Sequence, residues 1–242
     1  MTKEELQDDL NTDIINRIEA KNIEIVLSPS TDTCWTSELD LNNNKCYIGH
    51  FTTNYPKACY THELLHIDTQ LKDYKQVKYG ISAFDQTPYF ITLLETLDNE
   101  LQHHKMFEHF KFPKEQFYID TDAETENRLR LYLNRPLKEF NQAFLNYLTL
   151  IAPGGHISST DRNILKESFR NINGRSFADF FVHIDNVFSE WQNSDSYDNS
   201  IPLKQIFLAL PNGEITYFGY QDKSQFPNDG FFVDKPFDIK EK

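Results

Sequence analysis

KACYTHELLHIDTQL, at residues 57–71, is the stretch of the chain that decides how the rest is interpreted. Apolar residues recur in it at the three- and four-residue intervals of an α-helix: Tyr60, Leu64, Ile67 and Leu71. We therefore predict a helix over residues 52–74, anchored in a hydrophobic core by this apolar face. His62 and His66 fall on nearly the opposite side of the helical wheel, where they are free to line a cleft.

His62, Glu63 and His66 form an H-E-x-x-H motif on this predicted helix. Histidines four residues apart project from the same helical face, so both imidazoles can reach one metal ion. Neutral imidazole is a good ligand for Zn²⁺, and a catalytic zinc site has three protein ligands and one water. Glu63 lies beside the first histidine, where its carboxylate can act as general base on the zinc-bound water. The alternative is that both histidines are solvated or capping residues of an amphipathic helix.

The third metal ligand is expected to come from outside the motif. Some H-E-x-x-H enzymes have a glycine three residues, and a histidine six residues, after the second motif histidine. Thr69 and Lys72 occupy these positions here, so that arrangement is excluded. The ligand is therefore sought further along the chain, in a second helix predicted over residues 89–110.

The second helix carries a polar stripe of Glu95, Asn99 and His103, opposite an apolar stripe of leucines. At about 1.5 Å per residue, Glu95 and His103 are about 12 Å apart along the helix axis, so both cannot bind one ion. The sequence leaves the choice between these two ligands open. Asn99 is expected to hydrogen-bond whichever of them binds the metal. A different interpretation is that the stripe is simply a hydrated face of the helix.

Around these two helices the sequence predicts an α+β fold. An asparagine-rich turn at residues 40–44 favours antiparallel pairing of the strands beside it. We expect a small antiparallel sheet packed on the H-E-x-x-H helix, followed by a mainly helical C-terminal half with a β-hairpin. The predicted strands span residues 23–27, 34–39 and 45–51, the further helices residues 3–20, 124–150, 161–170 and 176–191, and the hairpin residues 203–220.

Two domains are predicted from this order of elements. Residues 1–122 would form a metallopeptidase-like catalytic core. Residues 123–242 would form a helical region with the C-terminal hairpin, packed on that core.

Composition narrows the classes of function. The chain has 242 residues, with 24 Lys and Arg against 37 Asp and Glu and a formal net charge of −13, which argues against a nucleic-acid partner. It has neither a long apolar run nor a secretory signal at its N-terminus, so we expect no membrane association. Three cysteines, Cys34, Cys46 and Cys59, are too few for a disulfide framework. A cytoplasmic protein is the expectation.

With these features in place, residues 20–110 resemble the zinc metallopeptidases of the H-E-x-x-H group. A short sheet before the motif helix and a ligand-bearing helix after it are similar to the minimal gluzincin core, a plan shared by the ImmA/IrrE-like peptidases. NELQHHKMF, at residues 99–107, resembles the second helix of bacterial H-E-x-x-H proteins, in which the equivalents of Asn99 and His103 are paired. The chain lacks the clear glutamate signature of the ImmA/IrrE type.

The resemblance implies a way of binding substrate. The strand before the motif helix, KCYIGHF at residues 45–51, would be an edge strand that aligns an extended peptide by main-chain pairing. A tyrosine or histidine would stabilise the oxyanion that forms at the scissile carbonyl. The candidates are Tyr60, His50, Tyr89 and His109.

The function expected from the sequence is therefore that of a zinc-dependent metallohydrolase, specifically a peptidase acting on a peptide or protein substrate. Glu63 is its general base, and His62, His66 and either His103 or Glu95 bind the zinc. One alternative is a non-catalytic regulatory or interaction protein with a zinc-stabilised H-E-x-x-H core. Another is a zinc hydrolase that acts on a non-peptide amide.

Overall fold

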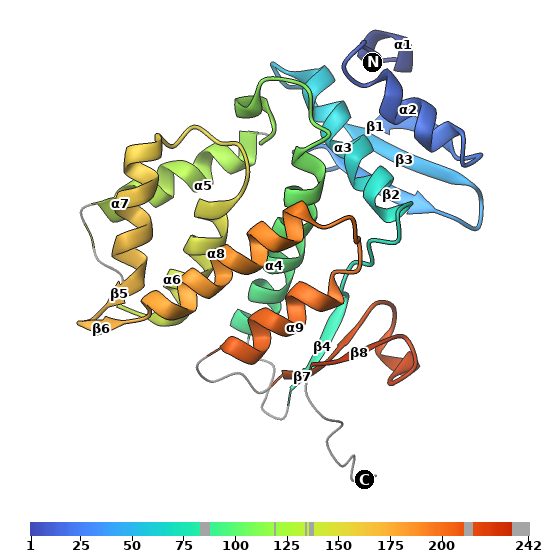
Figure 1. The fold of residues 1–242 in the computed structure, drawn as a ribbon. Coiled ribbons are helices and arrows are strands. Elements are labelled where there is room, and N and C mark those ends of the chain that lie inside the picture. The colour runs from blue at the N-terminus through green and yellow to red at the C-terminus, as the bar shows by residue number, and fades with distance from the viewer. Residues whose placement is uncertain (83–87, 119, 134, 136–137, 211–214, 234–242) are drawn as a thin grey trace. The chain divides into compact units, whose positions relative to one another are not determined.

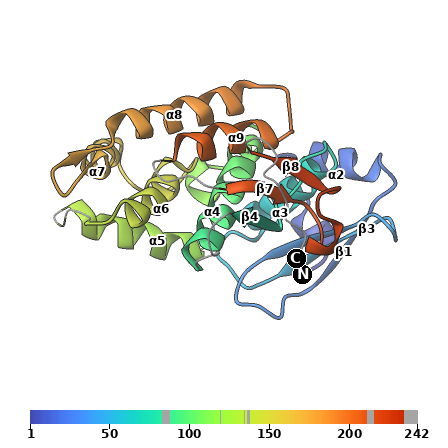
Figure 2. The same cartoon turned by 90° about the horizontal axis from the view of Figure 1, so that it is seen from below.

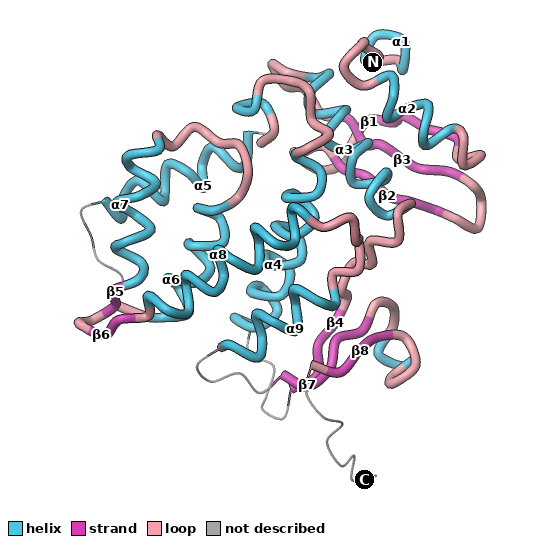
Figure 3. Tube along the Cα trace, in the orientation of Figure 1, coloured by secondary structure: helices cyan, strands magenta, loops and turns pink. Residues whose placement is uncertain are grey.

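The computed structural model describes residues 1–82, 88–118, 120–133, 135, 138–210 and 215–233 (Figure 1). The chain forms two compact units, each assembled from separate segments. The first contains Met1–Tyr74, Gln102–Arg135 and Ala152–Leu165, and the second contains Lys75–Leu101, Pro136–Ile151 and Lys166–Lys242. Helices and small sheets occur together in the described residues, which confirms the predicted α+β class (Figure 3).

The first unit contains the sheet and the helix predicted to carry the metal site. Helices α4 (Pro88–Phe107) and α7 (Ser159–Arg170) contribute residues to both units. The other described elements of the first unit are α1 (Lys3–Leu6), α2 (Thr12–Glu19), β1 (Glu24–Pro29), β2 (Thr36–Asp40), β3 (Lys45–His50), α3 (Pro56–Gln70), η1 (Lys114–Gln116), α5 (Asp120–Arg130) and η2 (Leu131–Leu133).

The sheet of the first unit is mixed, which corrects the prediction of an antiparallel sheet. Its strand order is β1-β3-β2, with β2 antiparallel to β3 but β1 parallel to β3 (Figure 1). Figure 2 shows β1 and β3 of this sheet from below. The predicted turn does join β2 to β3: Asn44 has a φ of 52°, and Asp40 Oδ1 accepts hydrogen bonds from the backbone of Asn42 and Asn43. The chain that leaves β1, however, continues into β2 on the opposite side of β3, so β1 and β2 are not neighbours in the sheet. The turn chemistry fixes one pair of strands and leaves the position of β1 to tertiary packing.

This order also corrects the predicted edge strand. β3 lies between β1 and β2 and pairs with both along its length, so it has no free edge for a substrate. The inward face of β3 carries the buried Cys46 and Ile48, which share a hydrophobic core with Tyr60, Leu64 and Ile67 of α3. The predicted apolar face of α3 is thus confirmed. The three cysteines are free thiols.

The second unit contains the remaining helices and two small sheets. The larger sheet has the order β4-β7-β8, the smaller one pairs β5 with β6, and all these pairings are antiparallel. Besides its share of α4 and α7, its described elements are β4 (Tyr79–Ser82), α6 (Phe140–Ile151), β5 (Asn171–Ile172), β6 (Arg175–Ser176), α8 (Ala178–Asn193), α9 (Ser200–Ala209), β7 (Ile215–Gly219), η3 (Lys223–Gln225) and β8 (Gly230–Phe232).

Two predictions about this half of the chain are wrong. The first strand of the predicted hairpin at 203–220 is helix α9, because Leu203, Ile206 and Phe207 are buried at helical spacing. Only β7 remains a strand, and the predicted turn between them lies outside the described residues. The predicted helix at 124–150 is divided into α5 and α6. The sequence between them contains Pro136, which cannot continue a regular helix.

The N-terminal helix is also divided, and the break serves to attach α3. Thr2 and Glu5 form a capping box that starts α1, and α2 begins only at Thr12. Between them, the buried Asn11 donates to the Leu6 carbonyl and to the Thr61 hydroxyl, at 3.1 Å in each case. Among the described residues, no helix combines the length and the apolar character needed to cross a bilayer.

An ion-pair network around the buried Asp68 fixes α3 against α2. Asp68 is 4% exposed and accepts two hydrogen bonds from the Arg17 guanidinium, at 2.9 and 3.1 Å, and lies 2.9 Å from Lys72 Nζ. Burial opposes the charged form of Asp68, but the hydrogen bonds from Arg17 and Lys72 outweigh it and hold the pKa of the carboxyl below its usual value. The bidentate geometry makes this the strong form of such a pair.

We predict that Asp68→Asn destabilises the protein by about 2 kcal/mol at pH 7, because a charged hydrogen-bond acceptor is lost from a buried site. The contribution of Asp68 is complete above the ordinary aspartate pKa of 3.8 and is lost as the pH falls through its lower folded value. Urea unfolding should therefore show the gap between the two proteins closing below that pH. Asp13→Asn is the matched control, since Asp13 also pairs with Arg17 but is 47% exposed, and it should cost less than about 1 kcal/mol. Equal effects of the two substitutions would contradict this assignment.

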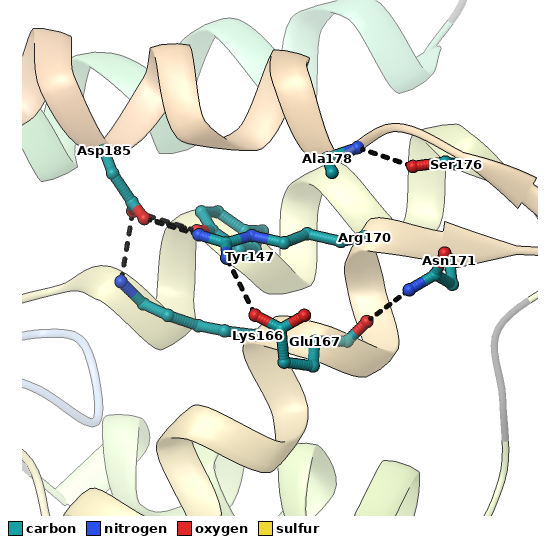
Figure 4. Close-up of polar contacts among 8 residues, drawn as sticks. All are labelled: Tyr147, Lys166, Glu167, Arg170, Asn171, Ser176, Ala178 and Asp185. Carbon is teal, nitrogen blue, oxygen red and sulfur yellow. Dashed lines mark hydrogen bonds and ion pairs between the residues drawn. The ribbon is translucent and has the colours of Figure 1, made fainter.

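A second polar network joins three helices of the second unit (Figure 4). Asp185 of α8 accepts hydrogen bonds from the buried hydroxyl of Tyr147 in α6, at 2.9 Å, and from Arg170 of α7, at 2.8 Å. Lys166 Nζ lies 3.1 Å from the same carboxylate. Because its three partners lie on two other helices, Tyr147 on α6 and both Lys166 and Arg170 on α7, Asp185 connects elements that are distant in sequence.

We predict that Asp185→Ala lowers the free energy of unfolding by about 1–3 kcal/mol, since it leaves the Tyr147 hydroxyl without its acceptor. The control is Glu167→Ala, which also removes a partner of Arg170 but at a site that is 68% exposed. That change should cost less than about 1 kcal/mol in the same denaturation series. A loss as large for Glu167 as for Asp185 would refute the special role of Asp185.

Candidate metal centre

Helix α3 positions the motif between two buried surfaces. Pro56 occupies its first turn, where the missing N–H costs no hydrogen bond. Tyr60 and Leu64 on one side are fully buried, and His62 and Glu63 on the other are each only 4% exposed. The helix face that carries the histidines is therefore enclosed, which corrects the prediction of an open face.

Three histidines converge on one point in the first unit. His62 Nε2 and His66 Nε2, one helical turn apart on α3, are separated by 3.2 Å. His103, from the end of α4 that belongs to this unit, lies with its ring centroid 5.2 Å from that of His62 and 5.5 Å from that of His66. One ring nitrogen from each of the three lies within 4.8 Å of the other two.

This donor set fits a zinc ion. Two nitrogens bound at about 2.0–2.1 Å to one tetrahedral zinc lie about 3.3–3.4 Å apart, close to the separation of the His62 and His66 nitrogens. Three neutral imidazoles also leave one of four tetrahedral positions for water or substrate, as in catalytic zinc sites. The part of the chain that the structure describes contains one group of three histidines that could hold such an ion.

A buried amide holds one of the three rings in place. Gln102 Oε1 lies 2.9 Å from His66 Nδ1, while Gln102 Nε2 donates to the Thr69 hydroxyl at 2.6 Å and to the His66 carbonyl at 3.3 Å. The sequence pattern assigned this partner role to Asn99. Gln102 directly precedes His103 in the sequence, and this adjacency to a candidate ligand is the signal that could have identified Gln102.

Burial sets the protonation of the motif residues. It lowers the pKa of His62, and the neighbouring His66 and His103 lower it further. It also lowers the pKa of His66, although Glu63 and Gln102 act in the opposite direction. Both imidazoles are therefore held in the neutral form that binds metals.

Glu63 is the basic group of this site. Burial raises the pKa of its carboxyl, while His66 and a hydrogen bond with Ser37 of β2 oppose that increase. A carboxylate with a raised pKa is a stronger proton acceptor, as a general base requires. The direction of the pKa shift of Glu63 is thus the one that a general base would need.

Glu95 and Asn99, the other members of the predicted stripe, have different surroundings. Both are exposed on α4, in the second unit, and they line a cavity of about 500 Å³ together with Lys78, Tyr79 and other residues of that unit. Among the described residues, the group of ligands around His62 contains His66 and His103 but not Glu95. The geometry favours His103 as the third ligand.

Aromatic residues beside the histidines come from a segment that the sequence analysis treated as a connector. The Phe117 ring centroid lies 4.7 Å from that of His62, and the Tyr118 centroid lies 5.9 Å from that of His103.

The four residues predicted to stabilise an oxyanion are not among these aromatic neighbours. The side chain of Tyr89 lies outside the described residues, and the structure describes the surroundings of the other three. His50 lies by Trp35, the pKa of Tyr60 is raised by burial and Cys46, and that of His109 is lowered by burial, Lys72 and Arg17.

Comparison of the chain with protein-family models, with curated proteins and with solved structures finds no match. The likeness to the minimal gluzincin core stays a prediction from the motif. The case for a function therefore rests on the geometry of the three histidines and Glu63.

This geometry predicts which substitution removes the third ligand. His103→Ala should abolish retention of zinc, because two imidazoles alone complete only half of a tetrahedral site. Glu95→Ala, eight residues earlier on the same helix, should retain about one zinc per chain. Elemental analysis after dialysis checks both variants, and the reverse pattern would identify Glu95 as the ligand.

Proposed function

We propose that the protein is a zinc-dependent hydrolase that cleaves an amide bond, with a peptide as the substrate. The observation that carries this proposal is the convergence of three imidazoles within 4.8 Å beside the buried carboxylate of Glu63. A bound zinc would polarise the scissile carbonyl and lower the pKa of a water molecule. His62, His66 and His103 would hold it.

Three other residues of the site would transfer the proton, orient the general base and exclude water. Glu63 accepts the proton of the attacking water and returns it to the leaving nitrogen, so the bond cleaved is C–N and the bond formed is C–O. The hydrogen bond with Ser37 orients the Glu63 carboxylate. Phe117 is fully buried against His62 and keeps water from that side of the ring.

Strand β2 is the element that supports a peptide as substrate. In the order β1-β3-β2 it lies at an edge of the sheet, where the predicted β3 does not. Its Ser37 interacts with Glu63, so a peptide that extends the sheet along β2 runs past the general base. A protein that only keeps a zinc-stabilised core is the second candidate, and the burial of His62 and Glu63 favours it.

Metal analysis and turnover separate these two candidates. Wild-type protein should contain about one zinc per chain, and His62→Ala should contain none. His156→Ala is the control, since its side chain is exposed and lies outside the group of three histidines. It should keep the metal.

Glu63→Gln should keep the zinc and lower the turnover of a peptide library by about 10²–10⁴-fold, the usual contribution of a general base. Mass spectrometry of the cleaved library measures this effect. A Glu63→Gln variant that cleaves as fast as wild type would refute the catalytic proposal. Zinc binding without cleavage by either protein would favour the structural candidate.

A further inference from the structure

The hydrogen-bond partners of Gln102 indicate how its amide is oriented. Its Nε2 lies 3.3 Å from the His66 carbonyl, which can only accept a hydrogen bond. The Thr69 hydroxyl gives its own proton to that carbonyl, at 2.9 Å, and so accepts from Gln102 Nε2 at 2.6 Å. The amide nitrogen must face this pair, and the amide oxygen must face His66 Nδ1.

This orientation determines which nitrogen of His66 carries the proton. The Gln102 oxygen only accepts, so His66 Nδ1, at 2.9 Å, is the donor. A neutral imidazole has one N–H, and its second nitrogen is then a lone pair. For His66 this is Nε2, the atom that lies 3.2 Å from His62 Nε2 at the point where the three histidines meet.

We propose that Gln102 is the positioning residue of the metal centre, because it fixes the Nδ1–H tautomer of His66 before any metal binds. The metal-ligating role of His66 rests on the proposed function, whereas its tautomer is a property of the metal-free protein. Gln102 is buried, and Thr69 and the His66 backbone hold both ends of its amide. The lone pair of His66 is thus aimed into the site before a metal arrives.

Three variants separate positioning from packing. Gln102→Met keeps the volume of the side chain but removes the acceptor, and it should weaken zinc binding by about 10–100-fold, as loss of a partner of a ligating histidine does. Gln102→Glu keeps an oxygen acceptor for His66 Nδ1 and should bind zinc within about threefold of wild type or more tightly, since it adds a negative charge near the cation. Gln70→Met, a half-buried glutamine on the neighbouring helix α3, is the control and should bind zinc like wild type.

Zinc affinity is measured by competition with a chelator, and circular dichroism checks that each variant is folded. The tautomer is measured separately, by long-range ¹H–¹⁵N correlation spectra of metal-free wild-type protein, which does not depend on any variant folding. We expect His66 to be protonated at Nδ1. Protonation at Nε2, or a folded Gln102→Met variant with wild-type zinc affinity, would overturn the inference. A wild-type protein that binds no zinc would refute the proposed function, while the tautomer would still decide the role of Gln102.

Discussion

The candidate site depends on one close approach, that of the His62 and His66 ring nitrogens at 3.2 Å inside a largely buried pocket of side chains. Two neutral imidazoles at this distance either share one proton in a hydrogen bond or direct both lone pairs at a cation, and the second arrangement is that of a metal site. The same burial keeps the rings neutral and makes Glu63 more basic. The properties of the proposed metal ligands and of the proposed general base thus have one main physical cause, the exclusion of water.

The rest of the first unit maintains this approach. Asn11 attaches α3 to the N-terminal segment through Thr61, the residue before the motif, and Arg17 attaches it through Asp68, two residues after the motif. On the other side of the motif, Gln102 connects His66 to the helix that carries His103. The helix is therefore fixed by polar contacts at both ends of the H-E-x-x-H segment, and by the apolar core beneath it.

The sequence predicted the motif residues because a helix with a four-residue repeat needs no tertiary information to place His62 and His66 together. It could not choose between His103 and Glu95, since both lie on one stripe of the same helix and only packing decides which end of that stripe meets α3. The prediction of an antiparallel sheet was wrong for the same reason. The turn before Lys45 fixes one strand pair locally, whereas the place of β1 depends on contacts between distant segments. Helix α9 was predicted as a strand because a short apolar run is compatible with both the helical and the strand repeat.

X-ray absorption at the zinc edge, on protein loaded with one equivalent of zinc and then dialysed, tests the central claim most directly. We predict a first shell with three imidazole nitrogens at about 2.0–2.1 Å and one further light atom. The imidazole scattering should fall to two rings in the His103→Ala protein if any zinc is retained. A shell of oxygen or sulfur without imidazole, or the absence of bound zinc from the wild-type protein, would contradict the account.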